Sequence, residues 1–271
     1  HRTHVEQVLT ASAQIIHELL NRDVQQVGTG FKQVLLKSPG TGGFSVWFTN
    51  PVAIAVGVQN QVIPWSSMIH EIGHNLSLNF PAQHIYGGKI DGNANAIYSE
   101  CVAQILAHSA MQVLFTDRDK YGLGGDLLKE IEFSGRDSMA LVQKSYRDYS
   151  FANNPFSVWN DPATAADETF GTFMTVAHVF FREAEIAGRG YKIPAKRFFH
   201  LLRLFDAAMA TAYAPLTNSV QASTFRATLM VTAVSFAFEK NMKTDFEALG
   251  FPVSATIYQD LYQRASATPF P

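Results

Sequence analysis

Apolar residues in the first quarter of the chain follow two different spacings. From residue 4 to about 21 they recur every three or four positions, which predicts an amphipathic helix. Three short runs of apolar and β-branched residues follow, over 31–37, 44–49 and 52–58, and turn-forming Gly and Pro residues separate them. We therefore expect a helix followed by a small sheet.

A second helix is predicted between two prolines. Met68, Ile72 and Leu76 stand four residues apart and form one apolar stripe. Pro64 suits the first turn of a helix, and Pro81 is incompatible with its continuation. This segment is expected to be a helix of about four turns.

Most of the remaining chain has helical periodicity. After a loop rich in Gly, Asn and Asp, we expect helices over 96–115, 126–133, 137–148, 163–187, 195–213, 221–240 and 254–265. The predicted fold class is α+β, with a small N-terminal sheet, the helix between the two prolines, and a mainly α-helical C-terminal part. We expect two subdomains, residues 1–115 and 116–271, with a cleft between them.

Composition narrows the function classes. Hydrophobic residues make up 47% of the 271 residues and charged residues 16%, as in an ordered globular protein. The net charge of −2 gives no electrostatic reason to expect a nucleic-acid partner, and no apolar run is long enough to span a membrane. Cys101 is the only cysteine, which excludes an internal disulfide and a Cys-rich zinc site. The sequence does not indicate an oligomeric state.

The second helix carries a His-Glu-x-x-His motif. His70 and His74 stand one turn apart on the same helical face, so both can reach one metal ion. Glu71 lies beside that face, where it can polarise a water molecule. A chance match is roughly a one-in-a-hundred event for this composition. The alternative is two surface histidines on an amphipathic helix, but the flanking residues are uncharged: Met68, Ile72, Gly73, Asn75 and Leu76.

A catalytic zinc ion needs a third protein ligand and an open fourth position. The metzincin class of peptidases would have a third His six residues after His74, where this chain has Phe80. His84 lies beyond the predicted end of the helix and would need a tight return of the chain. Glu100 lies 26 residues after His74, early in the next predicted helix. Two antiparallel helices would then complete a site of two His and one Glu.

This combination resembles the gluzincin zinc metallopeptidases. The His70–His74 motif, followed at this distance by Glu100 within Tyr98-Ser99-Glu100-Cys101-Val102-Ala103, is most similar to the enhancin-like peptidases. That group includes proteases that act on mucin-type glycoproteins. The resemblance covers residues 52–103, so it concerns about a fifth of the chain.

The resemblance implies a zincin-like fold and a role for each motif residue. His70, His74 and Glu100 would bind Zn²⁺, and Glu71 would act as general base in the hydrolysis of protein or glycoprotein substrates. Four residues after the ligand Glu, thermolysin-type enzymes have Asp where this chain has Gln104. This departure leaves the residue that orients the histidines unassigned.

The sequence leaves alternatives for the substrate-binding strand and for the oxyanion partner of such an enzyme. The run 52–58 is either a core strand or the edge strand that pairs with an extended peptide. A Tyr or His should stabilise the developing oxyanion, and the available residues are Tyr86, Tyr98, Tyr121, His108, His178 and Tyr191.

Two other functions are compatible with a zinc site at the motif. A deformylase-like amidase would supply a Cys ligand before the motif, and no Cys precedes His70. A non-catalytic, zinc-stabilised binding module would not need Glu71.

We expect a secreted or extracellular protein, because the chain begins at His1 rather than Met and the resembled family is mostly extracellular.

Overall fold

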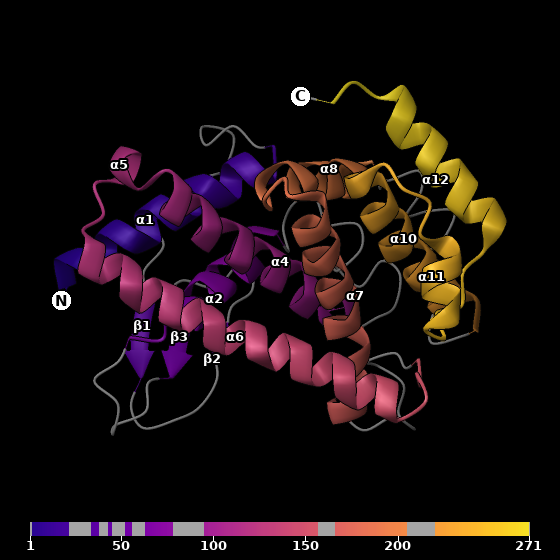
Figure 1. The fold of residues 1–271 in the computed structure, drawn as a ribbon, viewed down its shortest axis with the longest axis horizontal. Helices are drawn as coiled ribbons and strands as arrows, with labels where there is room; N and C mark the ends of the chain where they lie inside the picture. Colours follow the sequence, from indigo (N-terminus) through magenta and orange to yellow (C-terminus); the bar gives the residue numbers. More distant parts are fainter. Residues whose placement is uncertain are drawn as a thin grey trace.

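The computed structural model describes the backbone of residues 2–21, 34–37, 43–44, 52–55, 63–77, 95–156, 166–204 and 220–270. Side chains are described for these residues except 2–3, 34–37, 43–44, 52–55, 95–99, 166–170, 173 and 220–223. Figure 1 shows that helices dominate the molecule, with the C-terminal helices gathered at the end opposite the N-terminus.

The helices follow the order of the predicted periodic segments. They are α1 (Arg2–Leu19), α2 (Trp65–Ser77), α4 (Asn95–Thr116), α5 (Arg118–Tyr121), α6 (Gly125–Phe151), α7 (Ala166–Ala187), α8 (Lys192–Arg203), α10 (Val220–Phe238), α11 (Lys243–Ala248) and α12 (Ala255–Ala267). The helices expected near α1, α2, α4, α7, α10 and α12 are confirmed. The helix expected over 195–213 is confirmed as far as α8 extends, and residues 205–213 lie outside the described part. The two expected over 126–133 and 137–148 are one continuous helix, α6, and the short helices α5 and α11 were not anticipated.

Two short strands form within the runs predicted to be extended, and a third begins one residue before such a run. They are β1 (Val34–Lys37), β2 (Gly43–Phe44) and β3 (Val52–Ala55), in the order β1-β3-β2. Strand β1 is parallel to β3, and β2 is antiparallel to it. Because β3 is paired on both sides, its described residues do not form the free edge strand considered for peptide binding. Residues 56–58 of that run lie outside the described part.

The expected α+β fold class is wrong. Among the residues whose side chains are described, 82% are helical and none lies in a strand, so the fold is all-α. Among the residues whose side chains are described, the buried apolar ones come from the helices and the turns next to them. The division into subdomains 1–115 and 116–271 stays a prediction.

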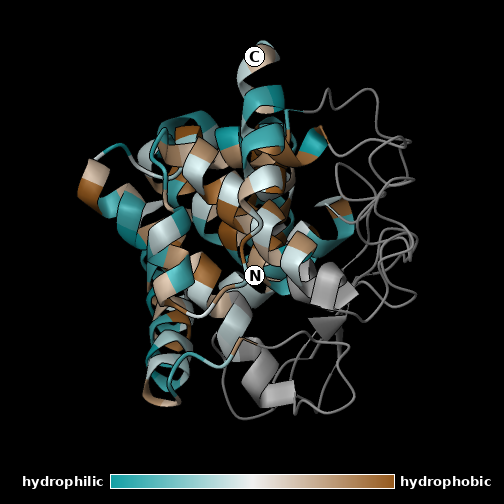
Figure 2. Cartoon of the chain, turned by 90° about the vertical axis from the view of Figure 1, so that its right-hand side faces the viewer, coloured by the Kyte–Doolittle hydropathy of each residue, from teal (hydrophilic) through white to brown (hydrophobic). Residues whose placement is uncertain are grey.

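Helix α4 lies at the centre of the bundle and packs against α2, the helix that carries the His-Glu-x-x-His motif. Every residue from Cys101 to Met111 is buried, because α4 packs against α1, α2, α6, α7 and α8. A helix that is apolar around most of its circumference is expected in such a position. Figure 2 shows the most hydrophobic segments in the middle of the bundle. Polar residues on this part of α4 therefore need a specific partner or a function.

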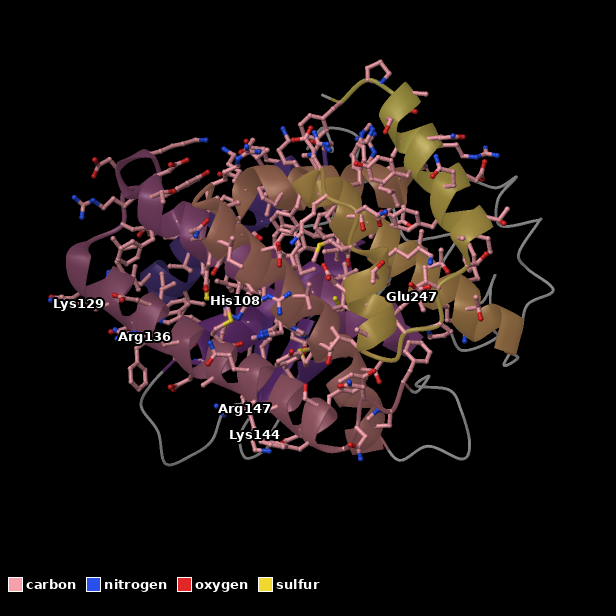
Figure 3. All side chains as sticks on the ribbon, turned by 45° about the vertical axis from the view of Figure 1, so that its right-hand side comes forward. His108, Lys129, Arg136, Lys144, Arg147 and Glu247 are labelled. Atoms are coloured by element: carbon pink, nitrogen blue, oxygen red, sulfur yellow. The ribbon has the colours of Figure 1, made fainter. Side chains whose placement is uncertain are left out.

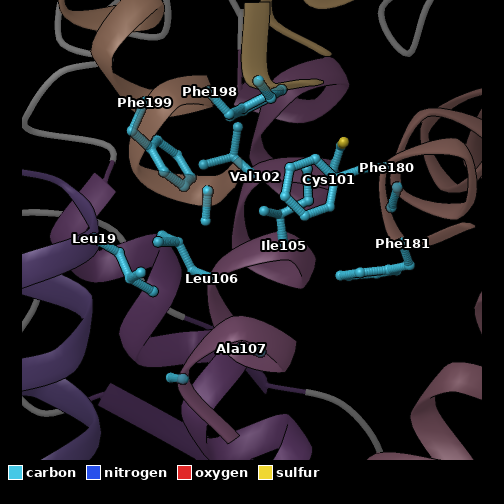
Figure 4. Close-up of a cluster of buried hydrophobic side chains, with 14 of the residues drawn as sticks. Leu19, Cys101, Val102, Ile105, Leu106, Ala107, Phe180, Phe181, Phe198 and Phe199 are labelled. Atoms are coloured by element: carbon cyan, nitrogen blue, oxygen red, sulfur yellow. The ribbon is translucent and has the colours of Figure 1, made fainter. Parts of the chain in front are cut away.

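The core on one side of α4 is largely aromatic. Ile105 and Leu106 of α4 lie among Phe180 and Phe181 of α7 and the phenylalanines of α8 (Figure 4). The rings of Phe180 and Phe198 lie edge to face, with their centroids 5.9 Å apart. This arrangement is typical of packed aromatic pairs, and it fixes α7 and α8 against α4.

Candidate metal centre

Two imidazoles from α2 and one carboxylate from α4 converge. His70 Nε2 lies 3.1 Å from Glu100 Oε2, and His74 Nε2 lies 3.4 Å from Glu100 Oε1. The two imidazole rings are nearly perpendicular, with centroids 4.5 Å apart. The three side chains predicted as ligands therefore lie together, while their role as ligands stays a prediction.

A glycine allows the two helices to approach this closely. A Cβ atom added at Gly73 would lie 3.2 Å from the Cα and 3.3 Å from the carbonyl oxygen of Ala103. Contacts at this distance would force the neighbouring backbone to move. Gly73 is therefore needed for close packing of α2 against α4, and that packing brings Glu100 to the histidines.

The motif residues form a group that could hold a metal ion. Suitable ligand atoms of His70, Glu71 and His74 all lie within 4.8 Å of one another. Glu71 is buried, and its Oε2 atom has no hydrogen-bond partner among the described residues. A buried carboxylate oxygen without a partner is costly unless a cation or water meets it, so the geometry fits a metal site.

The two carboxyl groups of the centre have opposite pKa shifts. Burial raises the pKa of Glu71 to about 7, against the opposing charge of His70. Burial alone would raise the pKa of Glu100 as well. Hydrogen bonds with His70 and His74 outweigh burial and hold the pKa of Glu100 well below its usual range. Glu100 is therefore ionised at neutral pH, as a metal ligand must be.

The pKa values of the two imidazoles are also shifted in opposite directions. Burial and the charge of His70 lower the pKa of His74, which favours the neutral form that binds metals. Burial acts in the same direction on His70, but the hydrogen bond and charge of Glu100 outweigh it and raise the pKa of His70. The side chain of His74 is 6% exposed, whereas those of His70 and Glu100 are 15% and 27% exposed. Within the described residues, the centre is thus most accessible at Glu100.

The second ring nitrogen of His70, Nδ1, makes a polar contact that the sequence did not assign. His70 Nδ1 is 2.9 Å from Gln104 Oε1, and Gln104 Nε2 donates to Ser138 Oγ at 2.7 Å. Gln104 occupies the position at which the sequence departs from the thermolysin-type pattern. Ser138 lies 34 residues further along the chain on α6, and no spacing rule could have indicated it.

The tyrosines considered for oxyanion stabilisation lie away from the centre or outside the described side chains. The Tyr191 hydroxyl donates to Glu185 at 3.3 Å, and the Tyr191 backbone N–H donates to Gln112, which lies twelve residues, or about 18 Å, along α4 from Glu100. Tyr121 is the last residue of α5, beyond the C-terminal end of α4. Tyr86 and the side chain of Tyr98 are outside the described part.

The histidines considered for the same role lie on α4 and α7. His108 is buried one turn from Gln104 and packs edge to face on Phe181, with ring centroids 5.0 Å apart. Figure 3 shows His108 inside the bundle. His178 stacks on Tyr146 of α6 at 4.0 Å. No oxyanion partner is therefore assigned among the described residues.

Comparisons with known proteins yielded no relative. No protein family, curated protein or solved structure matches the chain. In the described part of the chain, no helix has the length and apolar character needed to cross a membrane.

Proposed function

We propose that the chain is a zinc-dependent metallopeptidase with a gluzincin-type centre. The observation that carries this proposal is the position of the Glu100 carboxylate, which contacts Nε2 of both motif histidines. Two imidazoles and one carboxylate are the ligands of catalytic zinc in several peptidases, and a water molecule takes the fourth position there. The resemblance of the motif and its spacing to the enhancin-like peptidases supports the same assignment.

Each polar residue of the centre has a distinct role in this proposal. His70, His74 and Glu100 would hold the zinc ion, which when bound supplies a Lewis acid and lowers the pKa of a water molecule. Glu71 takes a proton from the attacking water on its carboxylate and delivers it to the leaving amine. In the metal-free chain burial raises the pKa of Glu71 to about 7, so its carboxylate is a stronger base than an exposed one.

Polypeptides or glycoproteins are the proposed substrates, and a secreted location is proposed with them. Both rest on the family resemblance. Cleavage-site profiling on a complex mixture of secreted proteins, before and after enzymatic deglycosylation, tests the substrate class. Cuts that disappear after deglycosylation support a glycoprotein substrate, and cuts that persist support ordinary polypeptides.

The test of the activity is a peptide-library cleavage assay on wild type and Glu71→Gln, with zinc content measured in parallel. Glu71→Gln should keep its zinc and lose activity by about 10²–10⁴-fold, the usual contribution of a general base. A chelator should abolish the wild-type activity. Glu132→Gln, an exposed glutamate on α6, is the matched control and should behave as wild type.

Two outcomes would favour the rival functions. Hydrolysis of small formylated amides without cleavage of any peptide would indicate an amidase. Zinc binding without hydrolysis of either substrate class would indicate a binding module.

A further inference from the structure

We propose that Gln104 and Ser138 form a positioning relay that orients His70 for metal binding and links α6 to the metal centre. The relay consists of the two hydrogen bonds that join His70 of α2, Gln104 of α4 and Ser138 of α6. This inference rests on the proposed function, since it concerns how His70 presents Nε2 to a metal ion.

The direction of the hydrogen bonds determines which nitrogen of His70 is free to bind a metal. With Gln104 Oε1 accepting from His70 Nδ1, a proton stays on Nδ1, and Nε2, which forms a hydrogen bond with Glu100 in the metal-free chain, is the nitrogen that can bind a cation after losing its proton. The opposite orientation of the amide would donate to Nδ1 and leave the proton on Nε2. In the structure the amide has the first orientation, with Nε2 donating to Ser138 Oγ.

Burial makes this relay costly to break. Gln104 is buried on a stretch of α4 in which nearly all neighbours are apolar, and its amide oxygen and nitrogen each have one partner. Loss of either partner would leave a buried polar group unsatisfied. The orientation of Gln104, and through it that of His70, therefore depends on a side chain from a third helix.

The neutral charge of Gln104 distinguishes the relay from a carboxylate–histidine pair. Two carboxylates, Glu71 and Glu100, already lie near the histidines. An amide accepts the Nδ1 proton without adding a third negative charge, whereas a carboxylate would make His70 a more basic ligand. Glu at position 104 would keep both contacts, because the Ser138 hydroxyl can donate to a carboxylate as well as accept from an amide.

Ser134 offers a matched control one turn earlier on α6. Its Oγ accepts from the backbone N–H of Ser66 and donates to Ser66 Oγ, so it also ties α6 to the helix that carries the motif. Within the described part of the chain, the hydrogen bonds of Ser134 go to Ser66 and not to Gln104 or His70. Ser134→Ala therefore removes a link between α6 and α2 of similar kind without touching the relay.

The first measurement is the zinc dissociation constant of each variant by competition with a chromophoric chelator. Gln104→Leu should weaken zinc binding by about 10–100-fold, the usual effect of removing a group that orients a ligand. Ser138→Ala should weaken it in the same direction by a smaller factor, and Gln104→Glu should bind zinc at least as tightly as wild type. Ser134→Ala should bind zinc as wild type does.

The second measurement does not require zinc. In ¹⁵N-edited NMR spectra of the chelator-treated protein, the Nδ1 proton of His70 should give a resonance protected from exchange. Gln104→Leu should lose this protection, Ser138→Ala should reduce it, and Gln104→Glu should restore it. A mere packing role of Gln104 would not produce the rescue by Glu.

The outcomes separate this inference from the proposed function. Wild-type protein that binds no zinc would refute the proposed function, while the NMR comparison would still test the relay. Wild-type affinity in Gln104→Leu, or equal loss in Ser134→Ala and Ser138→Ala, would overturn the relay. If Gln104→Leu does not fold, the comparison of Ser138→Ala with Ser134→Ala and Gln104→Glu decides the question in the same way.

Discussion

The two glutamates of the centre differ in their partners, and this difference indicates their roles. Both are largely removed from water, but only Glu100 contacts the two imidazoles. The pKa of Glu100 is therefore depressed, and that of Glu71 is raised to about 7. Carboxyl groups whose environments shift their pKa values in opposite directions commonly divide the tasks of a site between them. Glu100 suits a permanent ligand and Glu71 a proton acceptor.

At the residue scale, His108 should make the stability of the fold sensitive to acid. Burial, with a smaller effect of His70, lowers the pKa of His108 to about 3, from 6.5 in an unfolded chain. Between these values the unfolded state binds more protons, so stability falls as the pH drops below about 6.5. The slope due to His108 approaches about 1.4 kcal/mol per pH unit. His108→Leu should show a shallower loss of unfolding free energy between pH 7 and pH 4.

Denaturant unfolding at several pH values, with a chelator present throughout so that metal loss does not contribute, measures this slope. His4→Gln, a substitution at an exposed position of α1, is the control. An identical pH dependence in His108→Leu and wild type would show that His108 is not kept neutral by burial.

The site could be predicted from sequence as far as its residues lie on local patterns. The spacing of His70 and His74 on one helix and the position of Glu100 on the next were sufficient to bring the three together. The contact between Gln104 and Ser138 was not predictable, because it depends on how α6 packs over α4. The same limit applies to the oxyanion partner, which no periodicity identifies.

At the scale of the elements, the close approach of α2 and α4 determines whether Glu100 reaches the histidines. Gly73→Val should separate the two helices and reduce the unfolding free energy by about 1–3 kcal/mol, the usual cost of overpacking. It should also weaken zinc binding, since the two histidines and Glu100 lie on different helices. Thermal unfolding and chelator competition measure the two effects.

Gly135 on α6 provides the matched control for this substitution. An added Cβ there would only meet the flexible side chain of Met111, at 3.5 Å. Gly135→Ala should be neutral or stabilise the helix by up to about 1 kcal/mol, because Ala is the better helix former. Wild-type zinc affinity in Gly73→Val would contradict the role given to the helix contact.

Gly135 also explains a wrong element prediction. The glycine interrupts the helical pattern of the sequence, so two helices were expected where α6 is continuous over 27 residues. Tertiary packing of α6 against α2, α4 and α7 overrides the low intrinsic propensity of one glycine. The helices with long uninterrupted periodicity, by contrast, were correctly predicted.

At the scale of the whole molecule, one hydrophobic core joins the N-terminal and C-terminal helices. Buried residues of α1, α2 and α4 belong to the same cluster as those of α7, α8, α10 and α12. We therefore expect a single cooperative unfolding transition, even though the chain was predicted to contain two subdomains. Far-UV circular dichroism and the fluorescence of buried Trp65 should give coincident denaturation curves. Two separated transitions would show that the halves are independent.

The fold class could not be predicted correctly because extended runs do not reveal how long a strand becomes. Strands β1 and β3 lie within the runs 31–37 and 52–58, and β2 reaches only the first residue of the run 44–49. In the described part of the chain none of these strands exceeds four residues. A layer of sheet needs longer strands to cover a helical face. The helices instead pack on one another around α4.

The zinc content of the purified protein tests the central claim most directly. Elemental analysis of wild type, prepared without chelators, should find about one zinc ion per chain, held by His70, His74 and Glu100. His74→Ala and Glu100→Ala should each lose most of this zinc while keeping their helical circular dichroism. Wild-type protein without stoichiometric zinc, or Glu100→Ala with undiminished zinc, would contradict the account.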